Sequence, residues 1–143
     1  MSNKVKAAII GLGWAGCEHL KGYAENPLSE VVAVCDMDQE RADQVAQEND
    51  VPQIFTDHRQ LLEQEDIAVV SIGLPNFLHA PVTIDALNAG KHVLCEKPPA
   101  RNAEEAIAMA EAADKNGKTL MYALVLRFAG DAQALRKMVD DGE

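Results

Sequence analysis

The chain has 143 residues, 48% of them hydrophobic, and a formal net charge of -10. A chain of this length and apolar content can bury one hydrophobic core, so we expect a single domain over residues 1–143. Nucleic acids and acidic membrane surfaces are bound through clustered lysine and arginine, and the acidic balance therefore disfavours both as partners. We expect a small molecule as the ligand.

The cysteines Cys17, Cys35 and Cys95 are odd in number and show no CxxC pairing. Because two of them fall within apolar runs, we predict buried free thiols in a reducing compartment, and no metal centre. The sequence holds no run of about 18 apolar residues and no signal-peptide pattern. A cytoplasmic location is therefore the expectation.

The first predicted strand, Val5 to Ile10, runs directly into the segment GLGWAG at residues 11–16. Glycines at this spacing between a strand and a helix are typical of the turn that binds the diphosphate of a dinucleotide. The first allows the tight turn, the second lets the backbone approach the diphosphate, and the third lets the next helix, about 15–24, pack closely. Free N–H groups at a helix start attract anions. We predict cofactor contacts at Gly11, Leu12, Gly13, Trp14, Ala15 and Gly16.

The second predicted strand, 31–35, ends in Asp36, which lies 20 residues beyond Gly16. An acid at this position accepts hydrogen bonds from the ribose hydroxyls of NAD and repels the 2′-phosphate of NADP. Asp38 is the competing acid, which we interpret as the cap of the next helix. Arg41 can stack on adenine, pair with a 2′-phosphate or lie on the helix surface. NAD is the predicted cofactor, with NADP possible.

Further short apolar runs alternate with helical patterns along the rest of the chain. This alternation predicts an α/β fold, a doubly wound parallel sheet covered by helices on both faces. Asn102 is predicted to cap a helix that ends at Gly117. A last amphipathic helix is predicted over 131–141, with Gly142 as its stop. The remaining strands are predicted at 54–55, 68–72, 92–95 and 120–126.

Three segments follow predicted strands, and ligands of open α/β sheets bind at the carboxyl ends of strands. The fourth strand is followed by GLPNFLHAP, a loop that starts a helix, with Pro75 and Asn76 expected on the nicotinamide side. The fifth is followed by Glu96, Lys97 and Pro98, and Pro98 favours an extended Lys97 whose side chain points outward. Arg127 and Phe128 follow the sixth. His79, expected in the first turn of the helix after the fourth strand, is more in keeping with packing or capping than with acid–base catalysis. The cofactor-binding residues predicted here are Gly73, Leu74, Pro75, Asn76, His79, Glu96, Lys97 and Arg127.

Together GLGWAG, Asp36, GLPNFLHAP, CEKP and the Arg-Phe pair resemble the N-terminal Rossmann domain of the glucose-fructose oxidoreductase, inositol dehydrogenase and MocA family. The resemblance covers nearly the whole chain, and its most specific element is Glu96-Lys97-Pro98. It implies an NAD(P)-dependent oxidoreductase that transfers hydride between nicotinamide and a hydroxyl-bearing carbon of a sugar, cyclitol or related molecule. It also implies that Lys97 is catalytic and orients or polarises the substrate oxygen, since an ammonium stabilises a developing alkoxide. Glu96 would position Lys97 or line the cofactor pocket, with a plain exposed glutamate as the alternative.

Two departures from the family pattern limit these implications. Family members take their main acid–base residues from a C-terminal α+β substrate domain, which the 143 residues do not contain. We therefore expect the chain to end at the domain junction and to lack catalysis alone, with a missing substrate domain or a homo-oligomer as partner. The segment 122–128 is also more apolar than the corresponding family strand.

Two other functions are compatible with a glycine-rich first turn. A stand-alone dinucleotide sensor would signal through a partner chain, docked around Phe128 and the last helix. A methyltransferase also uses a glycine-rich loop and an acid after the second strand, but the Glu-Lys-Pro triplet argues against it.

Overall fold

The computed structural model describes residues 4–142 and contains a parallel sheet of six strands in the order β3-β2-β1-β4-β5-β6. This is the strand order of the doubly wound dinucleotide-binding fold, so the predicted fold class is confirmed. The strands are β1 (Val5–Ile10), β2 (Ser29–Cys35), β3 (Gln53–Phe55), β4 (Val69–Ile72), β5 (His92–Cys95) and β6 (Leu120–Tyr122). The helices are α1 (Trp14–Glu25), α2 (Gln39–Glu48), α3 (His58–Leu62), α4 (Asn76–Asn88), α5 (Ala103–Asn116), the 3-10 helix η1 (Val125–Phe128) and α6 (Gly130–Asp141).

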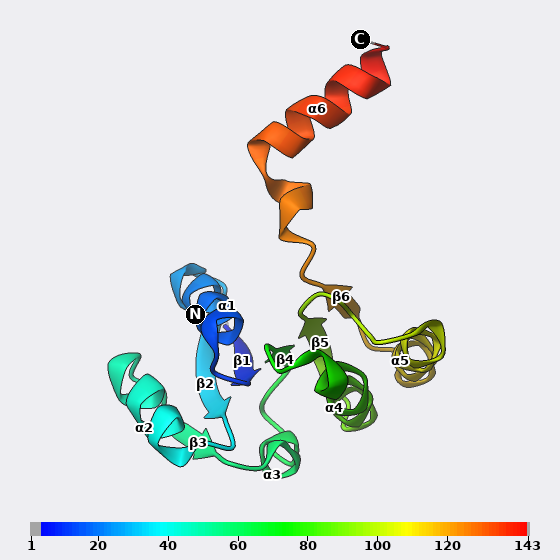
Figure 1. The fold of residues 1–143 in the computed structure, drawn as a ribbon. Helices are drawn as coiled ribbons and strands as arrows, with labels where there is room; N and C mark the ends of the chain where they lie inside the picture. Colours follow the sequence, from blue (N-terminus) through cyan, green and yellow to red (C-terminus); the bar gives the residue numbers. More distant parts are fainter. Residues whose placement is uncertain (1–3, 143) are drawn as a thin grey trace.

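Two hydrophobic cores lie on the two faces of the sheet. Alternate side chains of a strand point to opposite faces, so Ile9 and Val34 pack with α1 and α2, whereas Ile10 and Cys35 pack with α3, α4 and α5. Figure 1 shows α1 and α2 on one side of the sheet and α4 and α5 on the other. The central strands read as continuous apolar runs because both of their faces are covered.

The predicted helix caps are present. Asp38 Oδ1 accepts a hydrogen bond of 3.2 Å from the Arg41 N–H at the start of α2. Asn102 Oδ1 accepts one of 2.8 Å from Glu105 at the start of α5, which ends at Gly117 with φ +60°. These caps were predictable because each depends only on residues a few positions apart.

The sixth strand is shorter than predicted. β6 ends at Tyr122, because its partner β5 ends at Cys95 and pairs Cys95 with Tyr122 as the last residues of the ladder. Beyond that point the chain turns into η1, with the Arg127 N–H bonded to the Leu124 carbonyl. The last apolar residues of the run 120–126 therefore lie beyond the strand. Pairing within the sheet does not explain why they are apolar.

The loop after β4 is also shorter than its sequence indicates. α4 begins at Asn76, directly after Pro75, and continues through Pro81. His79 therefore lies in the first turn of α4, as predicted.

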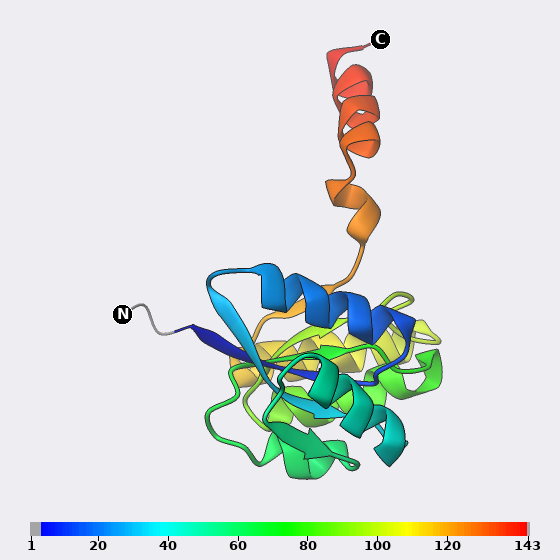
Figure 2. The ribbon, with the colours of Figure 1, turned by 90° about the vertical axis from the view of Figure 1, so that its left-hand side faces the viewer.

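The C-terminal segment leaves the body of the protein. Figures 1 and 2 show η1 and α6 projecting away from the sheet. The apolar side chains of this segment are exposed, among them Leu126, Phe128, Leu135 and Val139. Within residues 4–142, none of the helices has the length and apolar character needed to cross a membrane.

Candidate cofactor-binding site

A cleft of about 580 Å³ opens at the carboxyl ends of β1, β2 and β4. β1 and β4 are neighbours in the sheet, but the chain leaves them toward opposite faces, and ligands of such sheets bind at this switch point. Of the predicted site residues, the structure brings together Gly11, Gly13, Asp36, Arg41, Gly73, Leu74 and Pro75 around the cleft.

Three glycines pack the first turn against the loop after β4. Gly11 has φ +89°, a conformation that L side chains rarely adopt, which confirms the predicted tight turn. A Cβ added at Gly16 would lie 1.8 Å from the Gly11 carbonyl oxygen, and one at Gly73 would lie 2.7 Å from the Gly16 nitrogen. A Cβ at Gly13, by contrast, would meet nothing within 4 Å. Gly13 is therefore the point at which a ligand can reach the backbone.

The N-terminus of α1 is free to receive an anion. It has no side-chain cap and no acidic residue in its first turn. The Cys17 N–H bonds to the Gly13 carbonyl, so the N–H groups of Trp14, Ala15 and Gly16 precede the first helical hydrogen bond. Free N–H groups and the helix dipole favour a diphosphate here. Trp14 is 81% exposed.

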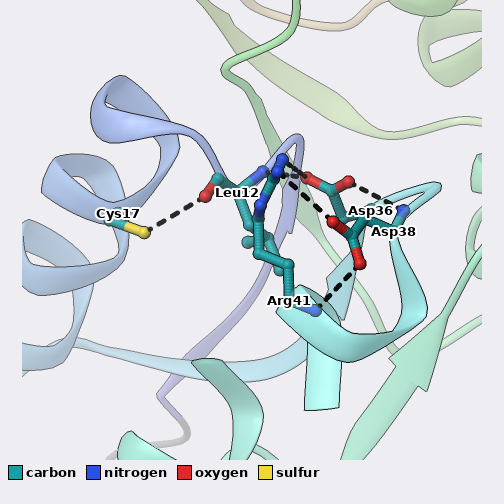
Figure 3. A network of polar contacts seen from close by, with 5 residues as sticks. All are labelled: Leu12, Cys17, Asp36, Asp38 and Arg41. Carbon is teal, nitrogen blue, oxygen red and sulfur yellow. Dashed lines mark hydrogen bonds and ion pairs between the residues drawn. The ribbon is translucent and has the colours of Figure 1, made fainter. Parts of the chain in front are cut away.

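Asp36 is held in place by the backbone on both sides of it. Its Oδ2 accepts a hydrogen bond of 2.8 Å from the Leu12 N–H, and its Oδ1 accepts one of 3.0 Å from the Asp38 N–H (Figure 3). The residue is only 7% exposed. An ionised carboxylate has about four acceptor positions. The Arg41 guanidinium uses a third at 3.4 Å, so one position is free for a ribose hydroxyl, and a second becomes free when Arg41 turns away. The free N–H groups at the start of α1, the open backbone at Gly13 and the carboxylate of Asp36 thus fit a dinucleotide.

Arg41 lies between two acids at the edge of the cleft. Its Nη1 is 3.4 Å from Asp36 Oδ2 and its Nη2 is 3.4 Å from Asp38 Oδ2 (Figure 3). The side chain is 49% exposed, so it can turn without disturbing the core. Stacking on adenine and pairing with a phosphate are both compatible with this position.

Lys97 follows β5, the neighbour of β4, and therefore lies at the same edge of the sheet as the cleft, although it does not line the cleft. Its side chain is exposed, and its peptide bond to Pro98 is cis. The Lys97 N–H donates to Glu96 Oε2 at 2.9 Å. Glu96 Oε1 lies 3.2 Å from His19 Nε2. Glu96 thus contacts the backbone of Lys97 and the ring of His19, and it does not line the cleft.

His79 is buried rather than open to the cleft, with 1% of its surface exposed. Its ring nitrogens lie 2.7 Å from the carbonyl oxygens of Leu74 and Pro98. The ring thus links the loops after β4 and β5, which fits the packing interpretation. A direct contact of its side chain with a cofactor has no support in this geometry.

Two other predicted residues lie outside the cleft. Asn76 is exposed at the start of α4. Arg127 is exposed on η1 and lines a separate hollow with residues of α6. The structure therefore does not bring Arg127 to the other predicted site residues.

Several lining residues were missed from the sequence: Met37, Thr56, His58, Phe77, Leu78 and Val82. Thr56 and His58 follow β3, so the strand-end rule that pointed to Asp36 applied to them too. His19, which contacts both Ser71 and Glu96, was also missed, and so was Ser71. The hydroxyl of Ser71 within the apolar strand β4 could have indicated a side-chain contact, because buried polar groups need hydrogen-bond partners.

The family model described as "Oxidoreductase family, NAD-binding Rossmann fold" matches residues 5–124. The chain belongs to this family, that of glucose-fructose oxidoreductase, inositol dehydrogenase and MocA. The chain is thus an NAD-binding Rossmann domain, as the resemblance implied.

Named relatives are sugar and cyclitol dehydrogenases. The chain is 39% identical to the D-glucoside 3-dehydrogenase of Escherichia coli over 142 residues, which cover 99% of the chain and 40% of that protein. It is 37% identical to an inositol 2-dehydrogenase of Salmonella typhimurium, covering 97% of the chain and 42% of the relative. The scyllo-inositol dehydrogenase of Lactobacillus casei, solved with NAD(H) and scyllo-inositol, matches with a TM-score of 0.92 and 26% identity, over 98% of this chain and 42% of that one. The chain thus spans about two fifths of these relatives.

Proposed function

We propose that this chain is the cofactor-binding part of a dehydrogenase that oxidises a CH–OH group of a sugar, a cyclitol or a related small molecule. One observation carries the proposal. The Leu12–Asp36 hydrogen bond holds a ribose-binding carboxylate against the open glycine turn at the start of α1. A bound nicotinamide cofactor would accept or return the hydride.

The preferred cofactor in this proposal is NAD. The 2′-phosphate of NADP would meet the negative charge of Asp36, which two backbone N–H groups keep from turning away. Arg41 is the residue that would have to move to offset this repulsion, because it is the cation beside Asp36.

Lys97 is the residue we propose at the reacting carbon. Its ammonium would donate a hydrogen bond to the substrate oxygen and stabilise the negative charge that develops there as hydride leaves. Its support is its place at the end of β5 and the hydrogen bond that fixes its backbone to Glu96.

The proposal includes a second surface that holds the substrate. The relatives are more than twice as long as this chain, and η1 and α6 expose apolar side chains that need a partner. We propose that a substrate domain packs there, with a second copy of the chain as the alternative partner. We also propose a cytoplasmic location, which the free thiols of Cys17, Cys35 and Cys95 support.

A chimaera tests this function. The chain replaces the corresponding part of the Salmonella inositol 2-dehydrogenase, and NADH formation is measured with inositol. We expect inositol-dependent reduction of NAD, because the cofactor part and the substrate part would meet as they do in the relative. A matched variant, Lys97→Met, keeps the length of the side chain and removes its charge.

We expect Lys97→Met to lower kcat/KM by about 100-fold or more, the usual effect of losing one transition-state donor. The variant should still bind NADH, because the contacts at the glycine turn and at Asp36 remain in place. A folded chimaera that binds NADH but forms none with inositol would contradict the proposed activity. Full activity of the Lys97→Met chimaera would contradict the role of Lys97.

A further inference from the structure

A chain of hydrogen bonds connects α1, β4 and the loop that contains Lys97. Ser71 Oγ of β4 lies 2.7 Å from His19 Nδ1 of α1, and His19 Nε2 lies 3.2 Å from Glu96 Oε1. The other oxygen of Glu96 accepts the Lys97 N–H. His19 therefore joins the helix that follows the glycine turn to the backbone of Lys97, through the side chain of Glu96.

The chemistry of these groups sets the direction of each hydrogen bond. An ionised carboxylate only accepts, so His19 Nε2 is the donor to Glu96. In the neutral ring Nδ1 is then an acceptor, and the hydroxyl of Ser71 is the donor that matches it. Each member of the network thus has a partner of the required type.

Burial makes this network sensitive to the loss of one member. Ser71 is 0% exposed, and the side chains of His19 and Glu96 are 10% and 13% exposed. A buried polar group that loses its partner keeps its full desolvation cost. The order serine, histidine, carboxylate also occurs in hydrolases, but a substrate cannot reach the fully buried Ser71 hydroxyl, so it cannot act as a nucleophile.

The loop around Lys97 is held from both faces of the sheet. On the face of α4, the Pro98 carbonyl lies 2.7 Å from His79 Nδ1. On the face of α1, the contact is the one between His19 and Glu96. The orientation of the Glu96 carboxylate, and with it the Lys97 N–H, thus depends on His19.

We propose that His19 is a positioning residue for Lys97, oriented by Ser71 and acting through Glu96. This role rests on the proposed function of Lys97 at the substrate. A consequence is that a shift of α1, whose N-terminus faces the cleft, is transmitted to the Lys97 loop by two side chains. His19 itself touches neither substrate nor cofactor in this account.

The test is the backbone amide resonance of Lys97 in two-dimensional NMR spectra of the chain and its variants. Glu96→Ala supplies the reference position without the carboxylate. In His19→Leu we expect the Lys97 amide to move most of the way to that reference, because the unpaired carboxylate no longer holds its orientation. In His19→Gln we expect it to stay near the wild-type position, since an amide can accept from Ser71 and donate to Glu96.

Two further variants complete the design. Ser71→Ala removes the hydroxyl that orients His19 and should shift the Lys97 amide resonance in the same direction as His19→Leu. This variant tests the proposal even if His19→Leu does not fold. Lys21→Leu changes an exposed residue of the same helix, paired with Glu18, and should leave the Lys97 amide in place. A Lys97 amide that stays at its wild-type position in His19→Leu and Ser71→Ala would overturn the proposal.

The same samples are titrated with NADH to keep the two proposals apart. Absence of NADH binding by the wild-type chain would count against the proposed function, whereas the comparison of the Lys97 amide needs no cofactor. We expect His19→Leu to change the dissociation constant for NADH by less than about threefold, because His19 does not line the cleft and the residues that do are unchanged.

Discussion

Asp36 combines two roles in one carboxylate. It accepts hydrogen bonds from Leu12 and Asp38 in the protein itself, and in our proposal it accepts the ribose hydroxyls of NAD. We expect Asp36→Ala to weaken NADH binding by about 10- to 100-fold, the value of hydrogen bonds to a charged group. Binding of NADPH should weaken less, because the repulsion of its 2′-phosphate is lost at the same time.

Calorimetric titration with both cofactors measures this change. Asp36→Asn is the matched control, because it keeps the shape and one acceptor oxygen but removes the charge. It should retain more NADH affinity than the alanine variant. Unchanged affinity of Asp36→Ala for both cofactors would refute the assignment of the ribose site.

Two glycines of α1 provide a matched pair for the packing of the first turn. A Cβ at Gly16 would overlap the Gly11 carbonyl oxygen, whereas a Cβ at Gly22 would meet nothing within 4 Å. We expect Gly16→Ala to destabilise the protein by more than about 2 kcal/mol, as overpacked sites do. Gly22→Ala should stabilise it by about 0.5–1 kcal/mol, the helix propensity of alanine over glycine. Urea unfolding measures both, and equal effects would show that the turn tolerates a side chain.

Two signals in the sequence were informative: local backbone geometry, and the rule that ligands bind at strand ends, which grouped the segments at Gly11, Asp36 and Gly73. The turn at Gly11 and the cap at Asp38 follow from local backbone geometry. The close packing of Gly73 on Gly16 and the pairing of His19 with Glu96 could not be predicted, because they join segments far apart in the sequence. Spacing along one chain carries no information about such contacts.

At the scale of the elements, the sequence predicted the order and type of the strands better than their ends. The run 120–126 was interpreted as one strand, but the ladder stops at Tyr122 where β5 has no further residue to pair. The length of an edge strand is set by its neighbour, and hydrophobicity alone does not encode it. Of the apolar residues beyond the strand, Ala123 is buried, whereas Val125 and Leu126 lie on the exposed η1.

The isolation of α6 leads to a prediction about truncation. α6 contacts η1 and projects away from the sheet (Figures 1 and 2). We expect a chain that ends after Ala129 to keep its free energy of unfolding within about 0.5 kcal/mol, because surface segments that pack on nothing contribute little. NADH affinity should also be unchanged. Urea unfolding and NADH titration measure both, and a loss of cooperative unfolding would mean that α6 belongs to the core.

At the scale of the whole molecule, two buried thiols should lower the free energy of unfolding at alkaline pH. Burial raises the pKa of Cys35 to about 12 and that of Cys95 to about 11, whereas a thiol in the unfolded chain ionises near pH 8.5. The unfolded state therefore loses these protons first as pH rises. Their contribution to stability is fully present below about pH 8.5 and is lost as pH rises through the folded pKa values.

We expect the urea midpoint of the wild-type chain to fall between about pH 8.5 and pH 11, the interval that separates the unfolded and folded thiol pKa values. The variant with Cys35→Ala and Cys95→Ala should have a lower urea midpoint than the wild-type chain at neutral pH. Its midpoint should fall less steeply as the pH rises. Burial also raises the pKa of Tyr23, which is present in both proteins. The pKa of Tyr122 is raised by burial and, to a smaller extent, by the charge of Cys95, which the variant lacks. Parallel pH profiles of the two proteins would contradict the assignment.

The central claim is that NAD binds in the cleft between the first glycine turn and the loop after β4. The most direct measurement is a titration of the chain with NADH and NADPH while the emission of Trp14, the single tryptophan, is recorded. Trp14 is the first residue of α1 and is exposed beside the proposed diphosphate site, so bound nicotinamide should quench it by energy transfer. Our account predicts saturable quenching at lower concentrations of NADH than of NADPH. A folded chain whose Trp14 emission responds to neither nucleotide would contradict it.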